Sequence, residues 1–350
     1  MSAPTTTRQW VLNKQITGEP VLDGPNATFS IRTVDLPALK DGQVLLRTKF
    51  LSNDPAQRGW ITPMESPDRL YVPPVQAGET MRAGAIAEVV ESKADSLPKG
   101  TLVQAYTGWT EYAVQDAAGL QPLQDVPGLS PTHFLGALGL TGLTAYYGIK
   151  IIAGAKPDDV VIVSGAAGAT GSMVVQIAKK LIGCKTVIGI AGGDAKCQWV
   201  KSLGADVCLN YKSPTFKKDL IEATPQYANV YFDNVGGEIL DLVLSRMALE
   251  GRVAVCGAIS GYNGTSGQLL KNWFDVITMR LLLKGFIVLD WVKQGKAKES
   301  IDEIANAAKE GKIKISDEGE TIVSASFEEI PKTWVKLFDG SNTGKLVTKL

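Results

Sequence analysis

A glycine-rich stretch near the middle of the chain has the spacing of a phosphate-binding turn. Residues 160–171 read VVIVSGAAGATG, and the helical pattern SMVVQIAKKLIG follows directly. One glycine allows a sharp turn, another lets backbone N–H groups approach a pyrophosphate, and the positive end of the next helix favours its charge. Glycines alone are weak evidence, because many tight strand-to-helix junctions use them. The prediction of a dinucleotide site depends on the position of this turn between a strand and a helix, within a series of alternating strands and helices.

The end of the next predicted strand, Thr186–Ile190, bears on which nicotinamide dinucleotide is bound. NAD enzymes typically present a carboxylate there to the ribose hydroxyls. Asp194 is the candidate, although it would serve equally well as a helix N-cap. Lys196, and Tyr211 with Lys212, offer positive charge and hydrogen bonds that suit a 2′-phosphate, so we expect NADP. Ordinary surface lysines are the alternative interpretation.

Other kinds of catalytic site are disfavoured by what the chain lacks. Its single histidine is His133, and no cysteine precedes Cys184. Histidine-dependent triads and a zinc site of histidine and cysteine ligands are therefore not expected, and we interpret His133 as structural. The four cysteines are Cys184, Cys197, Cys208 and Cys256. They form no CxxC pair, which indicates reduced thiols rather than a disulfide framework.

Composition narrows the class of protein further. The 36 basic residues balance the 36 acidic ones, and without a basic stripe nucleic-acid binding is disfavoured. Two uncharged stretches, 126–149 and 160–178, are interrupted by glycine or proline, so no membrane span is expected. The N-terminus has no apolar signal stretch, which favours the cytoplasm, and the final Thr348-Lys349-Leu350 is a weak relative of a peroxisomal address.

Two folding units are expected from the length and from a change of pattern along the chain. Short β-type runs dominate to about residue 129, which predicts an antiparallel, barrel-like domain. These runs are Gln43–Phe50, Ala85–Val90, Leu102–Tyr106 and Thr110–Val114. From about residue 130 strand, glycine turn and helix alternate, which predicts an α/β domain with a doubly wound parallel sheet.

The strands and helices expected in the α/β domain indicate where this domain begins and ends. Its strands are Val160–Ser164, Thr186–Ile190, Val207–Asn210, Val230–Phe232, Arg252–Cys256 and Lys284–Leu289, and its helices are Ser172–Ile182, Ala195–Leu203, Ile239–Leu249 and Glu299–Glu310. Later β-type runs, Glu320–Ser324 and Lys345–Thr348, are not needed by this sheet. We therefore predict a mostly-β domain over 1–129, a dinucleotide-binding domain over 130–310, and a return to the first domain over 311–350.

Several motifs in fixed order resemble one branch of the zinc-independent medium-chain dehydrogenases/reductases, that of leukotriene hydroxydehydrogenases, prostaglandin reductases and alkenal double-bond reductases. They are GLTGLTAYYGI (139–149), VSGAAGATGS (163–172), LGADVCLNYK (203–212), YFDNVGG (231–237) and VCGAISGYN (255–263), with SNDPAQRGW (52–60), GWTEYAV (108–114) and GSNTGK (340–345) toward the ends. The resemblance implies a GroES-like, mostly-β catalytic domain, a Rossmann domain that binds NADP, and a homodimer. An exposed edge strand of the Rossmann sheet would pair with its symmetry mate.

The same resemblance assigns residues to the cofactor. It gives Ala166–Ala169 to the pyrophosphate, Lys196 and Tyr211 to the 2′-phosphate, and Asn234 to the ribose and nicotinamide side. The full implied set is Ala166, Ala167, Gly168, Ala169, Lys196, Tyr211, Asn234, Cys256, Gly257, Ala258, Ile259, Phe286, Ile287, Val288 and Asn342. The alternative for Phe286–Val288 is a buried sheet strand, and the two roles are compatible.

Tyr262 matches the family's tyrosine that hydrogen-bonds the substrate carbonyl, although an aromatic residue in such a loop is otherwise a surface anchor. The implied reaction is NADPH-dependent reduction of the carbon-carbon double bond of an α,β-unsaturated aldehyde or ketone. Hydride transfer to the β-carbon creates an enolate, which an O–H donor stabilises, and the α-carbon takes a proton from Tyr262 or water. The alternatives are a zinc-free quinone oxidoreductase and an NADPH-binding structural or regulatory protein without relevant turnover.

The sequence departs from the family pattern directly after Asp54-Pro55. Relatives place a tyrosine and a methionine there, whereas this chain has Ala56 and Gln57. A smaller residue at this place predicts a substrate pocket of different shape, so the substrates of those relatives are not carried over.

Overall fold

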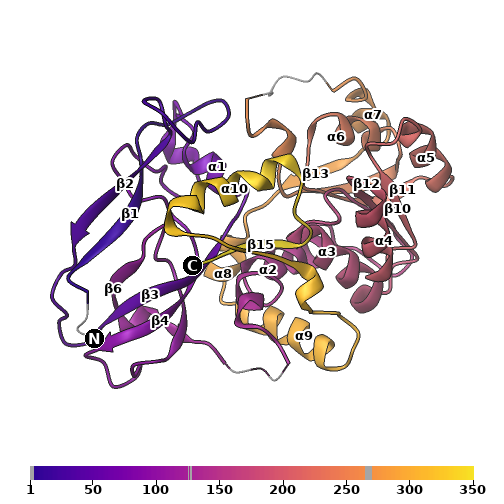
Figure 1. The fold of residues 1–350 in the computed structure, drawn as a ribbon. Helices are drawn as coiled ribbons and strands as arrows, with labels where there is room; N and C mark the ends of the chain where they lie inside the picture. The colour runs from indigo at the N-terminus through magenta and orange to yellow at the C-terminus, as the bar shows by residue number, and fades with distance from the viewer. Residues whose placement is uncertain (1–3, 125, 127, 265–269) are drawn as a thin grey trace. The chain divides into compact units, whose positions relative to one another are not determined.

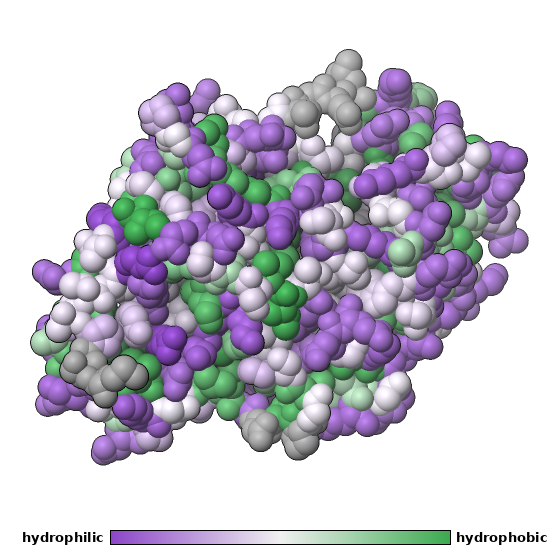
Figure 2. Space-filling model, viewed as in Figure 1, coloured by the Kyte–Doolittle hydropathy of each residue, from purple (hydrophilic) through white to green (hydrophobic). Residues whose placement is uncertain are grey.

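The computed structural model describes residues 4–124, 126, 128–264 and 270–350, and it divides the chain into two compact units (Figure 1). The first unit comprises Met1–Leu135 and Thr321–Leu350, and the second comprises Gly136–Glu320. On the face drawn in Figure 2, hydrophilic side chains are interspersed with hydrophobic ones. Among the described residues, no helix is both long enough and apolar enough to cross a bilayer.

The unit boundaries lie later in the chain than the predicted ones after residues 129 and 310, and packing explains both. The short helix η3 (Pro131–Leu135) places Leu135 in a cluster with Ile86 and Val347 of the first unit. At the other boundary, the Gln176 side chain exchanges two hydrogen bonds with the Lys314 backbone, at 3.2 and 2.7 Å, so this segment stays with the second unit. Neither contact is visible in a local sequence pattern.

The first unit is built on an antiparallel sheet, as the alternating β-type runs predict. Within the described residues the strand order is β14-β15-β3-β4-β5-β7, and β6 also pairs with β3. The strands are β3 (Gln43–Ser52), β4 (Ala85–Ser92), β5 (Leu102–Ala105), β6 (Tyr112–Asp116), β7 (Gln121–Pro122), β14 (Glu320–Ser324) and β15 (Lys345–Lys349). A separate antiparallel pair, β1 (Thr6–Leu12) and β2 (Phe29–Asp35), was not among the predicted runs.

Two helices complete the core of the first unit. The short α1 (Ala56–Trp60) follows β3, and α10 (Ile330–Asp339) buries Ile330, Trp334 and Leu337, which share one face at helical spacing. The Trp334 ring lies edge-on to the fully buried Trp109, with centroids 5.7 Å apart. These aromatic side chains tie the returning C-terminal segment to the strands of the first unit.

The second unit has a parallel sheet in the order β10-β9-β8-β11-β12-β13 within the described residues, which confirms the predicted doubly wound sheet. The strands are β8 (Val160–Val163), β9 (Thr186–Ala191), β10 (Val207–Asn210), β11 (Ala228–Asp233), β12 (Met247–Val255) and β13 (Leu282–Gly285), and every pair of neighbours runs parallel. Strand β8 is β-branched throughout, and Val161, Ile162 and Val163 are fully buried, as expected of a sheet covered on both faces.

Helices follow the strands in the usual alternation (Figure 1). They are α2 (Leu140–Tyr146), α3 (Ala169–Gln176), α4 (Asp194–Ser202), α5 (Phe216–Ala223), α6 (Gly237–Leu244), α7 (Phe274–Thr278), α8 (Val288–Lys293) and α9 (Ala297–Lys309). Two of them continue as π-helical turns, α2 into η4 (Tyr147–Ile152) and α3 into η5 (Ile177–Ile182).

Two predicted elements of this unit are wrong in part. The predicted strand Lys284–Leu289 ends at Gly285, because Val288 already begins α8. A short apolar run such as FIVL does not distinguish a strand from a helix by its period. The predicted helix Ile239–Leu249 ends at Leu244, since β12 begins at Met247.

Candidate functional site

The predicted cofactor residues of the second unit gather at one edge of its sheet. Ala166–Ala169 follow β8, Lys196 lies beyond β9, Tyr211 follows β10, Asn234 follows β11, Cys256–Ile259 follow β12, and Phe286–Val288 follow β13. The carboxyl ends of parallel strands share an edge, and the strand order reverses between β8 and β11, where such sheets bind ligands. Their assignment to a cofactor stays a prediction.

The glycine turn after β8 has the geometry that its spacing predicts. Gly165 has a φ of +57°, a conformation that favours glycine, and the Ala166 N–H donates to the Ile190 carbonyl at 3.0 Å. Gly168 is the N-cap of α3. A Cβ atom on Gly171 would lie 2.2 Å from the Gly165 oxygen, so only glycine lets α3 approach the turn this closely. The first-turn N–H groups of α3 are thereby directed at the turn, where an anion is favoured.

The predicted 2′-phosphate residues lie beyond two neighbouring strands. Tyr211 follows β10 directly, its side chain is 43% exposed, and its ring rests on the backbone of Gly192 beyond β9. A Cβ atom on Gly192 would lie 2.9 Å from the Tyr211 hydroxyl oxygen, which is too close. Tyr211 can therefore occupy this position only because residue 192 has no side chain. Lys196 lies in the first turn of α4. Tyr211 and Lys196 thus lie beyond the carboxyl ends of two adjacent strands.

Asp194 has a structural partner. It is the first residue of α4, and Gly193 occupies the N-cap position, so the alternative role of Asp194 as N-cap is wrong by one residue. Its carboxylate accepts a hydrogen bond from Asn210 Nδ2 at 2.9 Å, while Asn210 Oδ1 accepts from the N–H groups of Gly193 and Lys212 at 2.9 and 3.0 Å. Asp194 therefore helps to fasten the loops after β9 and β10 to each other.

Asn234 joins the loops after β8 and β11. Its backbone N–H donates to Ser164 Oγ at 3.0 Å, and its Nδ2 donates to the Ser164 carbonyl at 2.7 Å. The neighbouring carboxylate of Asp233 is fully buried and accepts from Ser164 Oγ at 3.0 Å. Sequence reasoning missed Asp233 and Ser164, whose only signal is their place beside the predicted motifs.

The Tyr262 hydroxyl lies against the loop that follows β12. Tyr262 closes the short helix η6 (Ile259–Gly261), and its oxygen accepts a hydrogen bond from the Ala258 N–H at 3.3 Å. A Cβ atom on Gly257 would lie 3.2 Å from the same oxygen, so a glycine there leaves room for the phenol. The ring is partly buried, which disfavours the alternative of an exposed surface anchor.

The backbone of Cys256 links the loop after β12 to the end of β11. Its N–H donates to the Asp233 carbonyl at 2.8 Å. Burial, and then the nearby charge of Asp233, raise the pKa of the Cys256 thiol to about 12. The sulfur is therefore protonated at neutral pH and is not a nucleophile there.

The Phe286 side chain belongs to an aromatic cluster inside the second unit. Its ring centroid lies 5.6 Å from that of Tyr147 and 6.0 Å from that of Phe232, both nearly edge-on. A Cβ atom on Gly148 would lie 2.5 Å from Phe286 Cζ. Phe286 and Ile287 form the link between β13 and α8, so the alternative of a buried strand is wrong for them. The ring of Phe286 is held in this cluster, and the assignment of Phe286–Val288 to the cofactor stays a prediction.

Three predicted positions belong to the first unit. Asn342 donates from Nδ2 to the Gly344 carbonyl at 2.9 Å and is not part of the strand-edge group. Gln57 is fully buried: its Oε1 accepts from the Asp54 N–H and its Nε2 donates to the Arg82 carbonyl, both at 2.8 Å. Gln57 therefore braces the segment after β3, and only Ala56 of the divergent pair is partly exposed.

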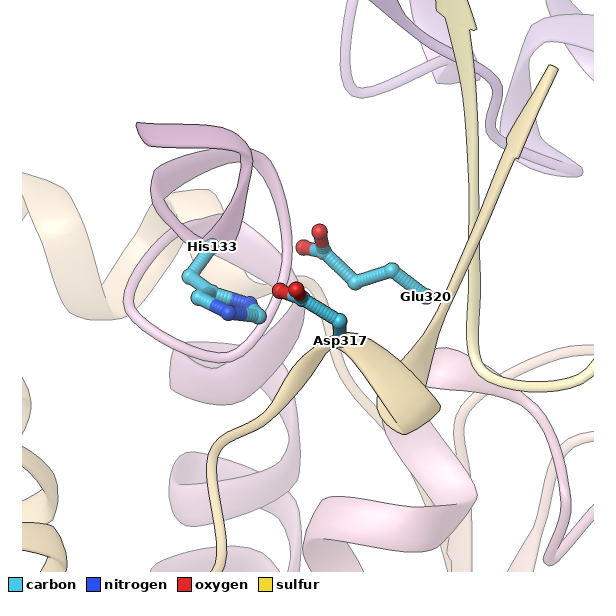
Figure 3. A group of neighbouring side chains, drawn as sticks. All are labelled: His133, Asp317 and Glu320. Carbon is cyan, nitrogen blue, oxygen red and sulfur yellow. The ribbon is translucent and has the colours of Figure 1, made fainter. Parts of the chain in front are cut away.

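His133 is buried in η3, with 2% of its surface exposed, as its structural interpretation predicts. Figure 3 draws it with Asp317 and Glu320, which come from the turn η7 (Asp317–Gly319) and the first residue of β14. The two carboxylates belong to the second unit and His133 to the first, so we assign no metal site to the three.

Comparison with known proteins covers nearly the whole chain. A family model described as the N-terminal domain of oxidoreductase matches residues 8–123, and one described as zinc-binding dehydrogenase matches residues 169–306. Prostaglandin reductase 1 of Bos taurus is 39% identical over 347 residues, which is 98% of each chain. NADPH-dependent curcumin reductase of Escherichia coli is 35% identical and covers 98% of this chain and 96% of its own.

A solved structure agrees with these relatives. CurA from Vibrio vulnificus in complex with NADPH superposes with a TM-score of 0.86, at 34% sequence identity and 98% coverage of both chains. Identity and coverage at this level, together with the parallel sheet and its glycine turn, establish the family. The chain is an oxidoreductase that belongs to the prostaglandin reductase family of zinc-independent medium-chain dehydrogenases/reductases.

Proposed function

We propose that the chain is an NADPH-dependent ene-reductase that saturates the carbon-carbon double bond of α,β-unsaturated aldehydes and ketones. The observation that carries the proposal is the Tyr262 hydroxyl at the carboxyl end of β12, beside the loops that the family resemblance assigns to the cofactor. Two relatives are named for NADPH, the curcumin reductase and the CurA complex. The glycine turn after β8 supplies the backbone geometry that a dinucleotide pyrophosphate requires.

In the proposed mechanism NADPH supplies a hydride to the β-carbon, and the protein handles the charge that results. Negative charge develops on the carbonyl oxygen of the substrate, where the Tyr262 O–H donates a hydrogen bond. The Ala258 N–H donates to the phenol oxygen, and a hydrogen bond accepted there polarises the O–H bond toward the substrate. A proton from Tyr262 or water then reaches the α-carbon, so that hydride and proton together complete the reduction.

A conservative change at Tyr262 tests this role. Tyr262→Phe removes the donor and keeps the ring, so we expect turnover of an enone to fall about 100-fold or more while the Kd for NADPH changes less than about twofold. Tyr227→Phe is the matched control, because Tyr227 is an exposed residue that precedes β11 at its amino end. Full turnover in Tyr262→Phe would show that this hydroxyl does not stabilise the enolate.

A substrate panel separates this proposal from its alternatives. One solved structure described as a quinone oxidoreductase and two described as putative NADPH:quinone reductases have the same fold, at 20% identity or less. NADPH oxidation by quinones without oxidation by enals or enones would favour the quinone oxidoreductase. NADPH binding without oxidation by any member of the panel would favour a structural or regulatory protein.

We also propose a homodimer formed through the β13 edge of the second unit. Strand β13 ends the sheet, and an edge strand presents unpaired backbone groups to a partner. Apolar side chains gather on β13 and on the segment of α7 before it. They are Trp273, Phe274, Ile277 and Leu282, with exposed fractions of 50, 68, 64 and 57%. Exposed apolar side chains beside an open edge are the features of a self-association surface.

The proposed compartment is the cytoplasm. Within the part of the chain that the structure describes, the cysteines are free thiols and form no disulfide. They are Cys184, Cys197, Cys208 and Cys256. A reducing compartment keeps thiols in this state. Cell fractionation checks the assignment, and recovery with peroxisomes would favour the C-terminal tripeptide as an address instead.

A further inference from the structure

The carboxylate of Asp233, the last residue of β11, is fully buried and takes its hydrogen bonds through one oxygen. Among the described residues, Oδ1 accepts from Tyr231 Oη at 2.7 Å and from Ser164 Oγ and the N–H groups of Val235 and Gly236, each at 3.0 Å. Oδ2 is buried with no partner among these residues. All four of these groups are donors, and the hydrogen bonds that they give to the carboxylate offset the cost of burying it.

This carboxylate shapes the turn that follows it. The N–H groups of Val235 and Gly236 come from the next residues of the chain, so Asp233 closes a local turn in which the side chain replaces a backbone acceptor. Gly236, with a φ of +67°, is the N-cap of α6, and Gly237, with a φ of +57°, is the first residue of that helix. The DNVGG segment therefore folds around the Asp233 side chain.

Asp233 and Ser164 also connect three loops. Ser164 Oγ donates to Asp233 and accepts from the Asn234 N–H, which ties the loop after β8 to the loop after β11. The Asp233 carbonyl accepts from the N–H groups of Cys256 and Gly257 at 2.8 and 3.1 Å, which ties in the loop after β12. The strands β8, β11 and β12 are neighbours, and their loops carry much of the predicted cofactor set.

We propose that Asp233 is a positioning residue for the cofactor, and that the Ser164 hydroxyl transmits its effect to the phosphate-binding turn. A site whose loops are already fastened loses less conformational freedom when its ligand binds. Removal of the bridge leaves the strands intact and frees the loops, so affinity for NADPH falls. The inference rests on the NADPH dependence in the proposed function and is independent of the substrate.

Two hydroxyl deletions form a matched pair. Ser164→Ala and Tyr231→Phe each remove one donor to the same Asp233 oxygen, and both side chains are fully buried. Ser164 lies in another loop, whereas Tyr231 lies two residues before Asp233 on the same strand. We expect both variants to lower the melting temperature, and only Ser164→Ala to raise the Kd for NADPH, by about 3- to 10-fold, the range of one net hydrogen bond.

The experiment is a fluorescence titration of each full-length variant with NADPH in the absence of substrate, alongside thermal melting. In steady-state assays, Ser164→Ala should raise KM for NADPH more than it lowers kcat. Asp233→Asn, which keeps the shape and replaces one carboxylate oxygen with an NH2 donor, should weaken NADPH binding at least as much. If Asp233→Asn does not fold, the comparison of Ser164→Ala with Tyr231→Phe still tests whether Asp233 positions the cofactor loops.

Equal effects of Ser164→Ala and Tyr231→Phe on the Kd for NADPH would overturn the proposal, and so would an unchanged Kd in Ser164→Ala. Both results would assign the network to stability alone. Failure of the wild-type protein to bind NADPH is a different outcome, which contradicts the proposed function itself.

Discussion

At the scale of single residues, Lys196 and Tyr211 test which dinucleotide the chain prefers. Both lie beyond the carboxyl ends of β9 and β10, where a 2′-phosphate would be read. Lys196→Ala removes a cation, so we expect KM for NADPH to rise about tenfold or more and KM for NADH to stay within about twofold. Steady-state assays with the two cofactors measure this difference.

The control for Lys196 is an exposed lysine at the amino end of a strand, which is the opposite edge of the sheet. Lys185 directly precedes β9 and is exposed, so Lys185→Ala should leave both KM values unchanged. An equal rise for NADPH and NADH in Lys196→Ala would contradict a role in reading the 2′-phosphate.

Single residues also show where sequence reasoning stops. The glycines at 165, 168 and 171 were identified because each relieves a constraint of the backbone. Asp233 was missed because an acidic residue at the end of a predicted strand looks like the start of a turn, and its partners Ser164 and Tyr231 are defined only by the folded chain. The divergent Gln57 suggested a change of pocket, yet its amide braces buried backbone groups.

At the scale of elements, η4 packs against the aromatic rings of Phe232 and Phe286. A substitution in η4 therefore tests whether this packing holds the link between β13 and α8, which Phe286 and Ile287 form. A Cβ atom on Gly148 would lie 2.4 Å from a Phe232 ring atom and 2.5 Å from a Phe286 ring atom. Gly148→Ala should therefore cost about 1–3 kcal/mol of unfolding free energy and displace the link between β13 and α8, which weakens NADPH binding. Denaturant unfolding and NADPH titration measure the two effects.

Gly285 provides the comparison for Gly148. It ends β13, a Cβ atom there would meet nothing within 4 Å, and its φ is not positive. Gly285→Ala should leave stability nearly unchanged. If the two alanine variants are equally stable, the close packing of η4 on the aromatic rings does not constrain this region.

Short apolar runs bounded by turn residues were the most predictable elements. The predicted strand Val207–Asn210 has the bounds of β10, and the predicted strand Val160–Ser164 extends the β-branched β8 by one residue. The pair β1 and β2 was not predicted, since neither TTRQWVL nor FSIRTVD alternates strictly between apolar and polar residues. Unit boundaries depended on packing between distant segments, which no local pattern reports.

At the scale of the whole molecule, the proposed dimer is checked by light scattering. We expect the mass of two chains for the wild type and of one chain for Ile277→Lys, because a lysine in the centre of an apolar interface leaves a buried charge unpaired. Ile151 is the control, since it lies in η4 and its side chain is 47% exposed. Ile151→Lys should remain a dimer, and a monomeric wild type would remove the basis for this interface.

Hydride transfer to the β-carbon is the defining step of the proposed reaction, and isotope transfer tests it most directly. The purified protein is incubated with an enone and with NADPH that carries deuterium at the transferable C4 position, and the product is analysed by NMR. We predict deuterium on the former β-carbon, a saturated carbon-carbon bond and an intact carbonyl group. Deuterium on a carbinol carbon, with the double bond retained, would contradict the account.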